Sequence, residues 1–163
     1  MLNNLAVMRD LHAASTIAYL VTHRTHLHLK GVSAVDIPRI FNVTESGHRI
    51  HNPFTPEKLA TLGAALRLKP GTRALDLGSG SGEMLCSWAR DYGISGTGID
   101  MSQLFSEQAK LRAEELGVSD RVAFIHGDAA GYVADEKVGL AACVGATWIG
   151  GGVAGTIELL ARS

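Results

Sequence analysis

The sequence predicts an α/β fold, a doubly wound parallel sheet with helices on both faces. From residue 55 onward, short apolar segments of strand length alternate with amphipathic segments of helix length. A glycine-rich turn at residues 78–82 follows the first of these strands, and a carboxylate, Asp100, ends the second. A turn and a carboxylate in these two places are typical of a doubly wound domain that holds a nucleoside cofactor.

The first helix of the domain is expected to begin at Thr55, whose side chain can cap it, with Pro56 in the first helical position. Leucines recur at helical spacing through residue 66, and the turn at residues 69–71 ends the helix. The remaining elements follow in order: a strand over 73–77, a helix over 83–92, a strand over 94–99, a helix over 102–116, strands over 122–125 and 138–144, and a last helix through residue 160.

Each of these assignments has a local reason. Apolar residues mark one face of the helices over 83–92 and 102–116, and Gly93 and Gly117 end them. The last strand is a nearly continuous apolar run, as expected for a strand buried on both faces of a parallel sheet. Strands that alternate with helices imply right-handed crossovers between parallel strands.

Residues 1–34 carry the weakest pattern. Residues 5–21 favour a helix, although they lack a clean apolar stripe, and the alternation over 25–29 is equally compatible with a short strand. Residues 35–54 contain two prolines and are expected to form an irregular lead-in. The sequence therefore suggests an N-terminal helical extension, residues 1–34, followed by a cofactor-binding domain, residues 35–163.

Composition narrows the function. The chain has 163 residues, enough for one domain with a hydrophobic core. Its net charge of −1 gives no sign of the basic surface that nucleic-acid binding requires. Its two cysteines are read as reduced, buried thiols, which fits the cytoplasm. No apolar run reaches the roughly 18 residues of a membrane-spanning helix, and the N-terminus lacks the pattern of a signal peptide. We expect a cytoplasmic protein without a membrane partner.

The glycine turn and Asp100 form a constellation with a physical purpose. Glycines at 78, 80 and 82 can adopt positive φ and leave room for a ligand against the backbone. The helix that begins near Glu83 directs free N–H groups and a partial positive charge at the turn. A carboxylate at position 100 can accept hydrogen bonds from both hydroxyls of a ribose.

The spacing Asp76-x-Gly78-x-Gly80-x-Gly82 differs from the Gly-x-Gly-x-x-Gly of dinucleotide-binding proteins. In this spacing the chain resembles the class I S-adenosylmethionine (SAM)-dependent methyltransferases. Their second motif, an acidic residue after the second strand, is matched by Asp100. Their third, which often reads Gly-Asp-Ala after the third strand, is matched by residues 127–129. The resemblance covers roughly residues 50–163.

The resemblance implies SAM as the cofactor and methyl transfer as the reaction. Asp128 would approach the adenine amino group, Ala129 the adenine ring, and Met101 would pack against the adenine. The full set of implied cofactor-binding residues shares the carboxyl ends of the predicted strands: Asp76, Gly78, Ser79, Gly80, Gly82, Asp100, Met101, Asp128, Ala129 and Val144.

The family has a seven-stranded sheet in the order 3-2-1-4-5-7-6 with the last strand antiparallel. The present sequence supplies strands one to four, so the chain is expected to be truncated at its C-terminus. The strand over 138–144 would then have an unpaired apolar edge, which favours aggregation or self-association.

The sequence indicates the methyl acceptor less clearly than the cofactor. Residues 144–148 lack the Asn/Asp-Pro-Pro-Tyr pattern of methyltransferases that act on nucleobase amino groups, which argues against DNA adenine or cytosine-N4 as the substrate but does not name the acceptor. We expect the acceptor to be a small molecule. His48 and His51 are candidates for the mouth of the site, Arg49 for pairing with a carboxylate, and Trp148 for the acceptor pocket. No catalytic residue is assigned.

Metal is not expected, because the four histidines at positions 12, 23, 26 and 28 lack ordered spacing and nearby carboxylates. Two alternatives to the methyltransferase remain. One is a truncated SAM-binding remnant without turnover, and the other is a nicotinamide-dependent oxidoreductase, which the glycine spacing disfavours. Binding of SAM against NAD, with methyl release measured on the same sample, would separate the three.

Overall fold

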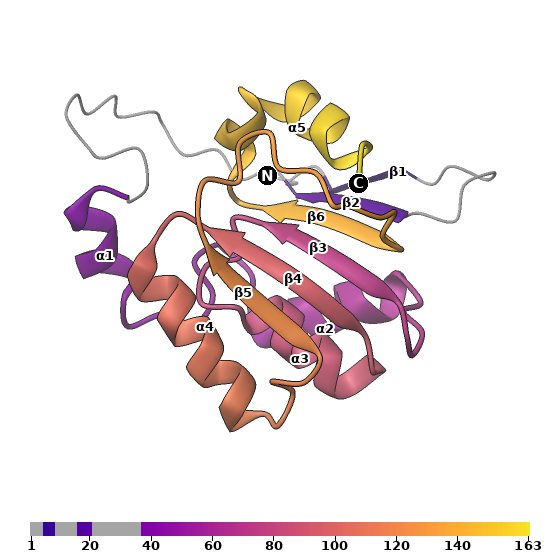
Figure 1. Ribbon diagram of the computed structural model, residues 1–163, viewed down its shortest axis with the longest axis horizontal. Coiled ribbons are helices and arrows are strands. Elements are labelled where there is room, and N and C mark those ends of the chain that lie inside the picture. The colour runs from indigo at the N-terminus through magenta and orange to yellow at the C-terminus, as the bar shows by residue number, and fades with distance from the viewer. Residues whose placement is uncertain (1–4, 9–15, 21–36) are drawn as a thin grey trace.

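A computed structural model describes residues 5–8, 16–20 and 37–163. Its sheet has the order β1-β2-β6-β3-β4-β5. The four strands predicted for the domain are parallel to one another: β3 Arg73–Leu77, β4 Ser95–Asp100, β5 Val122–His126 and β6 Leu140–Val144. Their carboxyl ends point to the same side, on the left in Figure 1. The order β5-β4-β3-β6 is the order 3-2-1-4 of the family that the sequence resembles, so the predicted fold class is confirmed.

Helices cover both faces of this sheet. Figure 1 shows α2 Pro56–Ala65, α3 Glu83–Tyr92 and α4 Gln103–Glu115 on one face, and α5 Val153–Leu160 on the other. The caps follow the sequence: the Thr55 side chain accepts a hydrogen bond from the Lys58 N–H, and Gly93 ends α3 with a φ of 68°. A short 3₁₀ helix, η1 Thr147–Gly150, links β6 to α5.

The sheet separates two apolar layers. Trp88 of α3 and Leu59 of α2 belong to one layer, and the Trp88 indole N–H donates a hydrogen bond to the Leu59 carbonyl at 3.2 Å. Leu75 and Leu77 of β3 belong to the other layer, with α5. Because side chains alternate along a strand, Asp76 points toward the α2–α3 layer. A carboxylate is thereby placed inside an apolar layer.

The helix expected over residues 5–21 is wrong where the structure describes this segment. Strands β1 Leu5–Met8 and β2 Thr16–Leu20 pair with each other in antiparallel fashion, and β2 runs parallel along β6 with Val144 opposite Leu20. Periodicity alone cannot separate a helix from a strand in a short apolar segment. Pairing with β6 decides the matter, because it satisfies the backbone groups of both strands.

The predicted unpaired edge of the fourth strand is wrong for the same reason, since β2 lies beside β6 along its whole length. The expected self-association through that edge therefore loses its structural basis. Residues 25–29, for which a strand was considered, lie outside the described residues.

The lead-in to the domain is more regular than predicted. Residues 39–45, expected to be irregular, form the helix α1 Arg39–Glu45 after Pro38. None of its residues is buried, and Asn42 is tied to the domain through a 3.0 Å hydrogen bond that its side-chain oxygen accepts from Ser102. No helix among residues 37–163 is long and apolar enough to cross a membrane.

Candidate functional site

The glycine turn between β3 and α3 has the backbone geometry that the sequence predicts. Gly78, Gly80 and Gly82 all adopt positive φ, at 76°, 54° and 75°. The Gly78 and Ser79 N–H groups donate to the Ile99 carbonyl at 2.8 and 3.1 Å, which fastens the turn to the end of β4.

Packing adds a second requirement at each of these glycines. A Cβ atom on Gly82 would lie 2.7 Å from the Ala109 side chain and from the Phe124 ring, so this glycine lets α3 and α4 approach the sheet. A Cβ on Gly80 would lie 2.8 Å from the His51 ring nitrogen Nδ1. The expected open space before the turn is therefore partly taken by a histidine of the lead-in.

Asp100 at the end of β4 lies directly beside the turn. Its Oδ2 accepts a 2.8 Å hydrogen bond from the Gly80 N–H, and its Oδ1 accepts one of 2.8 Å from the Ser102 N–H. Burial raises the pKa of this carboxyl above its ordinary value, while the two backbone hydrogen bonds oppose that rise. The carboxylate is thus held in one orientation by the backbone of both neighbouring loops.

Asp76 is a buried carboxyl group without a complete set of partners. Its side chain is 3% exposed, and Oδ1 has no hydrogen-bond partner among the described residues. Burial, followed by the charge of Asp100, raises the pKa of Asp76 to about 7. Such a group requires a cation or a donor to complete its surroundings.

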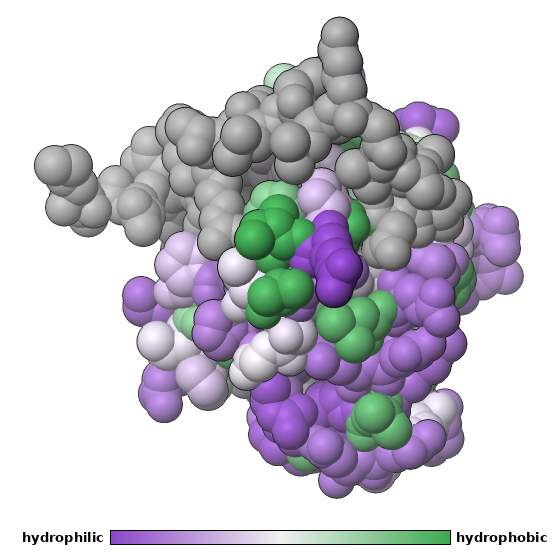
Figure 2. Space-filling view, turned by 90° about the vertical axis from the view of Figure 1, so that its left-hand side faces the viewer, coloured by the Kyte–Doolittle hydropathy of each residue, from purple (hydrophilic) through white to green (hydrophobic). Residues whose placement is uncertain are grey.

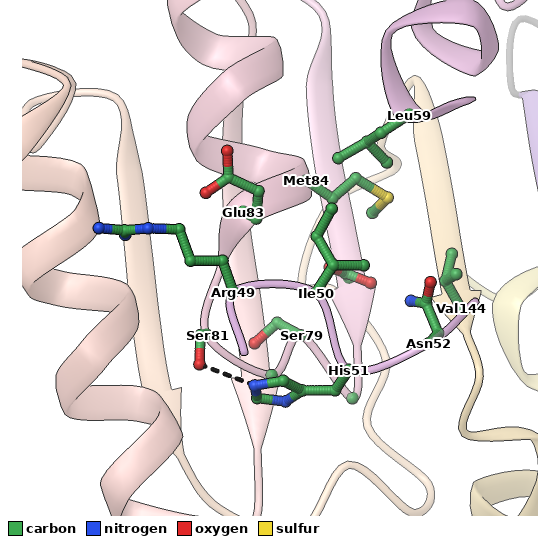
Figure 3. Close-up of a pocket in the computed structure, with 13 residues that line it drawn as sticks. Arg49, Ile50, His51, Asn52, Leu59, Ser79, Ser81, Glu83, Met84 and Val144 are labelled. Atoms are coloured by element: carbon green, nitrogen blue, oxygen red, sulfur yellow. Dashed lines mark hydrogen bonds between the residues drawn. The ribbon is translucent and has the colours of Figure 1, made fainter. Parts of the chain in front are cut away.

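A small cavity of about 50 Å³ lies beside Asp76. Residues 49–52 of the lead-in, residues 78–81 of the glycine turn, and Val144 at the end of β6 line it (Figure 3). In the close-up the lead-in passes in front of the turn, and the His51 ring lies next to Ser79 and Ser81. The three predicted features of the site, the turn, Asp76 and Val144, therefore meet at one cavity.

The residues of the third motif lie one strand farther along the same edge. Asp100 of β4 is opposite His126 of β5, and the Gly127 N–H donates to the Asp100 carbonyl at 2.9 Å. The His126 Nε2 lies 3.1 Å from the Met101 carbonyl oxygen. This pairing brings the third motif beside Asp100.

The two implied adenine contacts of this motif differ in exposure. Asp128 is exposed and its Oδ1 accepts a 2.8 Å hydrogen bond from the Ala130 N–H, whereas Ala129 is buried. Met101, the third implied adenine contact, is partly exposed. The structure therefore brings all ten implied residues to one edge of the sheet, with Gly82 in a packing position.

Among the lead-in candidates, His51 contacts the turn through its side chain. His48 is exposed with its Nδ1 3.3 Å from Glu45, and Arg49 pairs with Glu115 at 3.1 Å. Asn52 also lines the cavity. No motif or periodicity in the sequence indicated this role. Trp148, on η1 after β6, is 48% exposed.

Apolar surface gathers on this side of the molecule. Figure 2 views the side toward which the parallel strands run, and apolar residues are grouped near its middle, with polar residues below them. The exposed large apolar side chains include Ile40 and Val43 of α1, Ile125 of β5 and Trp148. Among residues 37–163 and the two N-terminal strands, no group of three metal-binding side chains is present, and the four N-terminal histidines lie outside the described residues.

Comparison with known proteins identifies relatives of this site. Residues 74–153 match the model of a family described as a methyltransferase domain. The protein YjhP of Escherichia coli (strain K12) is 77% identical over 129 residues, which are 79% of this chain and 52% of that protein. The 27-O-demethylrifamycin SV methyltransferase of Amycolatopsis mediterranei (strain S699) is 34% identical over 94 residues, 51% of this chain and 35% of that enzyme.

A solved structure agrees with these matches. The SAM-dependent methyltransferase of Geobacter sulfurreducens, crystallised with S-adenosyl-L-homocysteine, is 84% identical and superimposes with a TM-score of 0.78 over 79% of this chain and 52% of that one. The present chain spans about half the length of YjhP and of the Geobacter sulfurreducens methyltransferase.

Proposed function

We propose that this chain, which belongs to the class I SAM-dependent methyltransferase family, binds SAM at the carboxyl ends of β3 and β4 and transfers its methyl group to a small-molecule acceptor. The proposal assigns cofactor binding to residues 35–163. It places the protein in the cytoplasm, which two free buried thiols fit.

One observation carries the proposal: the buried Oδ1 of Asp76, without a hydrogen-bond partner among the described residues, beside a cavity at the glycine turn. The ammonium group of the methionine part of SAM supplies both the positive charge and the N–H donors that this oxygen lacks. An ammonium there would also favour the ionised form of Asp76, whose pKa of about 7 reflects burial without a cation. A nicotinamide dinucleotide offers no ammonium to this position.

Each of the other predicted residues is assigned to one part of the cofactor. Asp100, already oriented by Gly80 and Ser102, is assigned the ribose hydroxyls. Met101, Asp128 and Ala129 are assigned the adenine, in keeping with their place at the neighbouring strand end. Gly78, Ser79 and Gly80 are assigned backbone contacts and Val144 an apolar one, while Gly82 is assigned the packing that holds the turn in shape.

When bound, SAM supplies an electrophilic methyl group on a sulfonium sulfur, so the protein has mainly to orient the acceptor in line with it. The exposed Trp148 after β6 offers an apolar surface for that acceptor at the same sheet edge. A small-molecule acceptor is also supported by the rifamycin-modifying relative, whose name states the transfer of a methyl group to an oxygen of a small molecule.

The test measures binding and turnover on one sample of the chain. Calorimetric titrations with SAM and with NAD come first, followed by an assay for S-adenosylhomocysteine release across a panel of hydroxylated and amino-bearing small molecules. Binding of SAM without NAD, with release above the acceptor-free rate, is the expected result. SAM binding without release from any acceptor would favour a binding remnant, and tighter binding of NAD would refute the proposal.

A further inference from the structure

His51 reaches the glycine turn from the lead-in and is held by three kinds of contact. Its Nε2 lies 2.8 Å from the His48 carbonyl oxygen and 3.0 Å from the Ser81 Oγ. Its ring packs against the Phe105 ring of α4, with 4.1 Å between the ring centroids. Figure 3 shows the bond between Ser81 and one of the two ring nitrogens.

These contacts determine which nitrogen carries the proton. A carbonyl oxygen can only accept, so the Nε2 that faces the His48 carbonyl must be the N–H donor. The Ser81 hydroxyl donates its own hydrogen to the Gln108 Oε1 at 2.7 Å, so its oxygen is left to accept from His51. The Gln108 side-chain nitrogen in turn donates to the Ser46 carbonyl at 3.0 Å, which fixes the orientation of that amide.

In the neutral ring, Nδ1 therefore holds the lone pair. Desolvation by burial lowers the pKa of His51 below its ordinary 6.5, so the ring is neutral at neutral pH. Among the described residues no hydrogen bond is formed at Nδ1, which lies 2.8 Å from the position that a Cβ atom on Gly80 would take. The N–H of the same Gly80 donates to Asp100. The acceptor and the carboxylate assigned to the ribose thus share Gly80 as a neighbour.

We propose that the His51 Nδ1 accepts a hydrogen bond from a ribose hydroxyl of SAM, and that only the neutral ring binds the cofactor. This inference rests on the proposed function, because it adds a residue to the same cofactor site. A protonated ring has no lone pair at Nδ1 to accept that bond, and it would add a positive charge to the site of a cofactor that is itself a sulfonium cation. SAM affinity is therefore expected to fall as the pH drops through the pKa of His51.

Other groups near the ring also titrate, and the experiment has to separate them. The hydrogen bond to the His48 carbonyl raises the pKa of His51, as do the charges of Asp100 of β4 and Glu45 of α1, while the charge of the His48 side chain lowers it. Asp76 and Asp100 have raised pKa values of their own, so each binds its proton at a higher pH than an ordinary aspartate does. A fall of SAM affinity with pH alone would not distinguish them from His51.

Two substitutions test the two ring nitrogens separately. In His51→Gln the side-chain amide reaches the position of Nε2, so the contacts to His48 and Ser81 remain and the acceptor at Nδ1 is lost. In His51→Asn the side-chain oxygen takes the position of Nδ1, so the acceptor remains and the contacts made by Nε2 are lost. His48→Gln is the matched control, because the His48 side chain is exposed and only its carbonyl contacts His51.

The experiment titrates SAM into the four proteins by calorimetry at about pH 7.5 and about pH 5.5, with thermal melts to confirm folding. We expect His51→Gln to bind SAM about three- to tenfold more weakly at the higher pH, the effect of one lost hydrogen bond. His51→Asn and His48→Gln should stay within about twofold of wild type. Wild type should lose more affinity on acidification than His51→Gln. Nitrogen-15 NMR should show the Nε2–H tautomer in the free protein.

Three outcomes would overturn the inference while the proposed function stands. If His51→Gln keeps wild-type affinity and His51→Asn loses it, His51 serves only to hold the lead-in segment against the turn. If all three variants bind SAM as tightly as wild type does, the assignment of Nδ1 is wrong. The same follows if the ring of the free protein carries its proton on Nδ1. Wild-type protein that binds no SAM would refute the proposed function, and the inference with it.

Discussion

Replacement of Asp76 by asparagine should stabilise the free protein at alkaline pH and destabilise its complex with SAM. The pKa of Asp76 rises from 3.8 to about 7 on folding. Each pKa unit corresponds to about 1.4 kcal/mol, so ionised Asp76 costs the folded protein about 4 kcal/mol once both states are ionised. An asparagine amide at this buried position still lacks partners, which costs about 1–3 kcal/mol. The net gain expected at about pH 8 is about 1–3 kcal/mol.

The sign of this effect depends on pH. The folded state binds the Asp76 proton more tightly than the unfolded state does, so the free energy of unfolding falls as the pH rises from about 4 to about 7. Below about pH 5 the carboxyl is protonated in the folded protein, and the asparagine brings no gain. The stability ranking of wild type and Asp76→Asn should therefore reverse between about pH 5 and about pH 8.

Urea denaturation followed by tryptophan fluorescence measures the effect, because Trp88 is buried in the core. Ser106→Ala is the matched control: Ser106 carries the other buried side-chain atom without a partner among the described residues, and it does not titrate. Its effect on the free energy of unfolding should be the same at every pH. Saturating SAM should flatten the pH dependence of wild type more than that of Asp76→Asn. If the curves of wild type and Asp76→Asn run parallel from about pH 5 to about pH 8, the argument for Asp76 is refuted.

Three further outcomes are expected. Asp100→Ala should weaken SAM binding by about tenfold or more, because charge-assisted hydrogen bonds to the ribose are lost, and calorimetric affinity within twofold of wild type would contradict the assignment. Gly80→Val should abolish SAM binding, since a β-branched residue resists a φ of 54° and its Cβ would meet His51, and unchanged binding would remove the turn from the site. Burial raises the pKa of Cys86 and of Cys143 to about 12, so both thiols should resist a thiol reagent in the native protein and react on unfolding. Fast reaction of the native protein would show that one is accessible.

Most of the domain from residue 55 onward was predictable because its signals are local. The cap at Thr55, the glycine stop at Gly93 and the apolar run of β6 each depend on neighbouring residues only, and the strands and helices lie within two residues of their expected limits. The lead-in helix α1 was missed, since its contact with Ser102 joins residues 60 positions apart.

The candidate site, like the fold, was predictable from the sequence only in part. Glycines at alternate positions and Asp100 point to a cofactor site by spacing alone, because positive φ and a carboxylate at a strand end are properties of single residues. The same spacing says nothing of the direction in which His51 approaches the turn. The His48 carbonyl sets its tautomer, and the second contact of Nε2, with the Ser81 hydroxyl that donates to Gln108, exists only because α4 packs against the turn.

The sequence by itself determined the fold class, the order of the elements after residue 55 and the chemical type of the cofactor site, since each depends on periodicity or on single backbone conformations. The tertiary structure alone decided that β2 pairs with β6, that Asp76 is buried with an unpartnered oxygen, and that His51 lies over Gly80. Burial, pairing and charge are properties of residues that meet in space. No local pattern specifies them, because the partners come from distant parts of the chain.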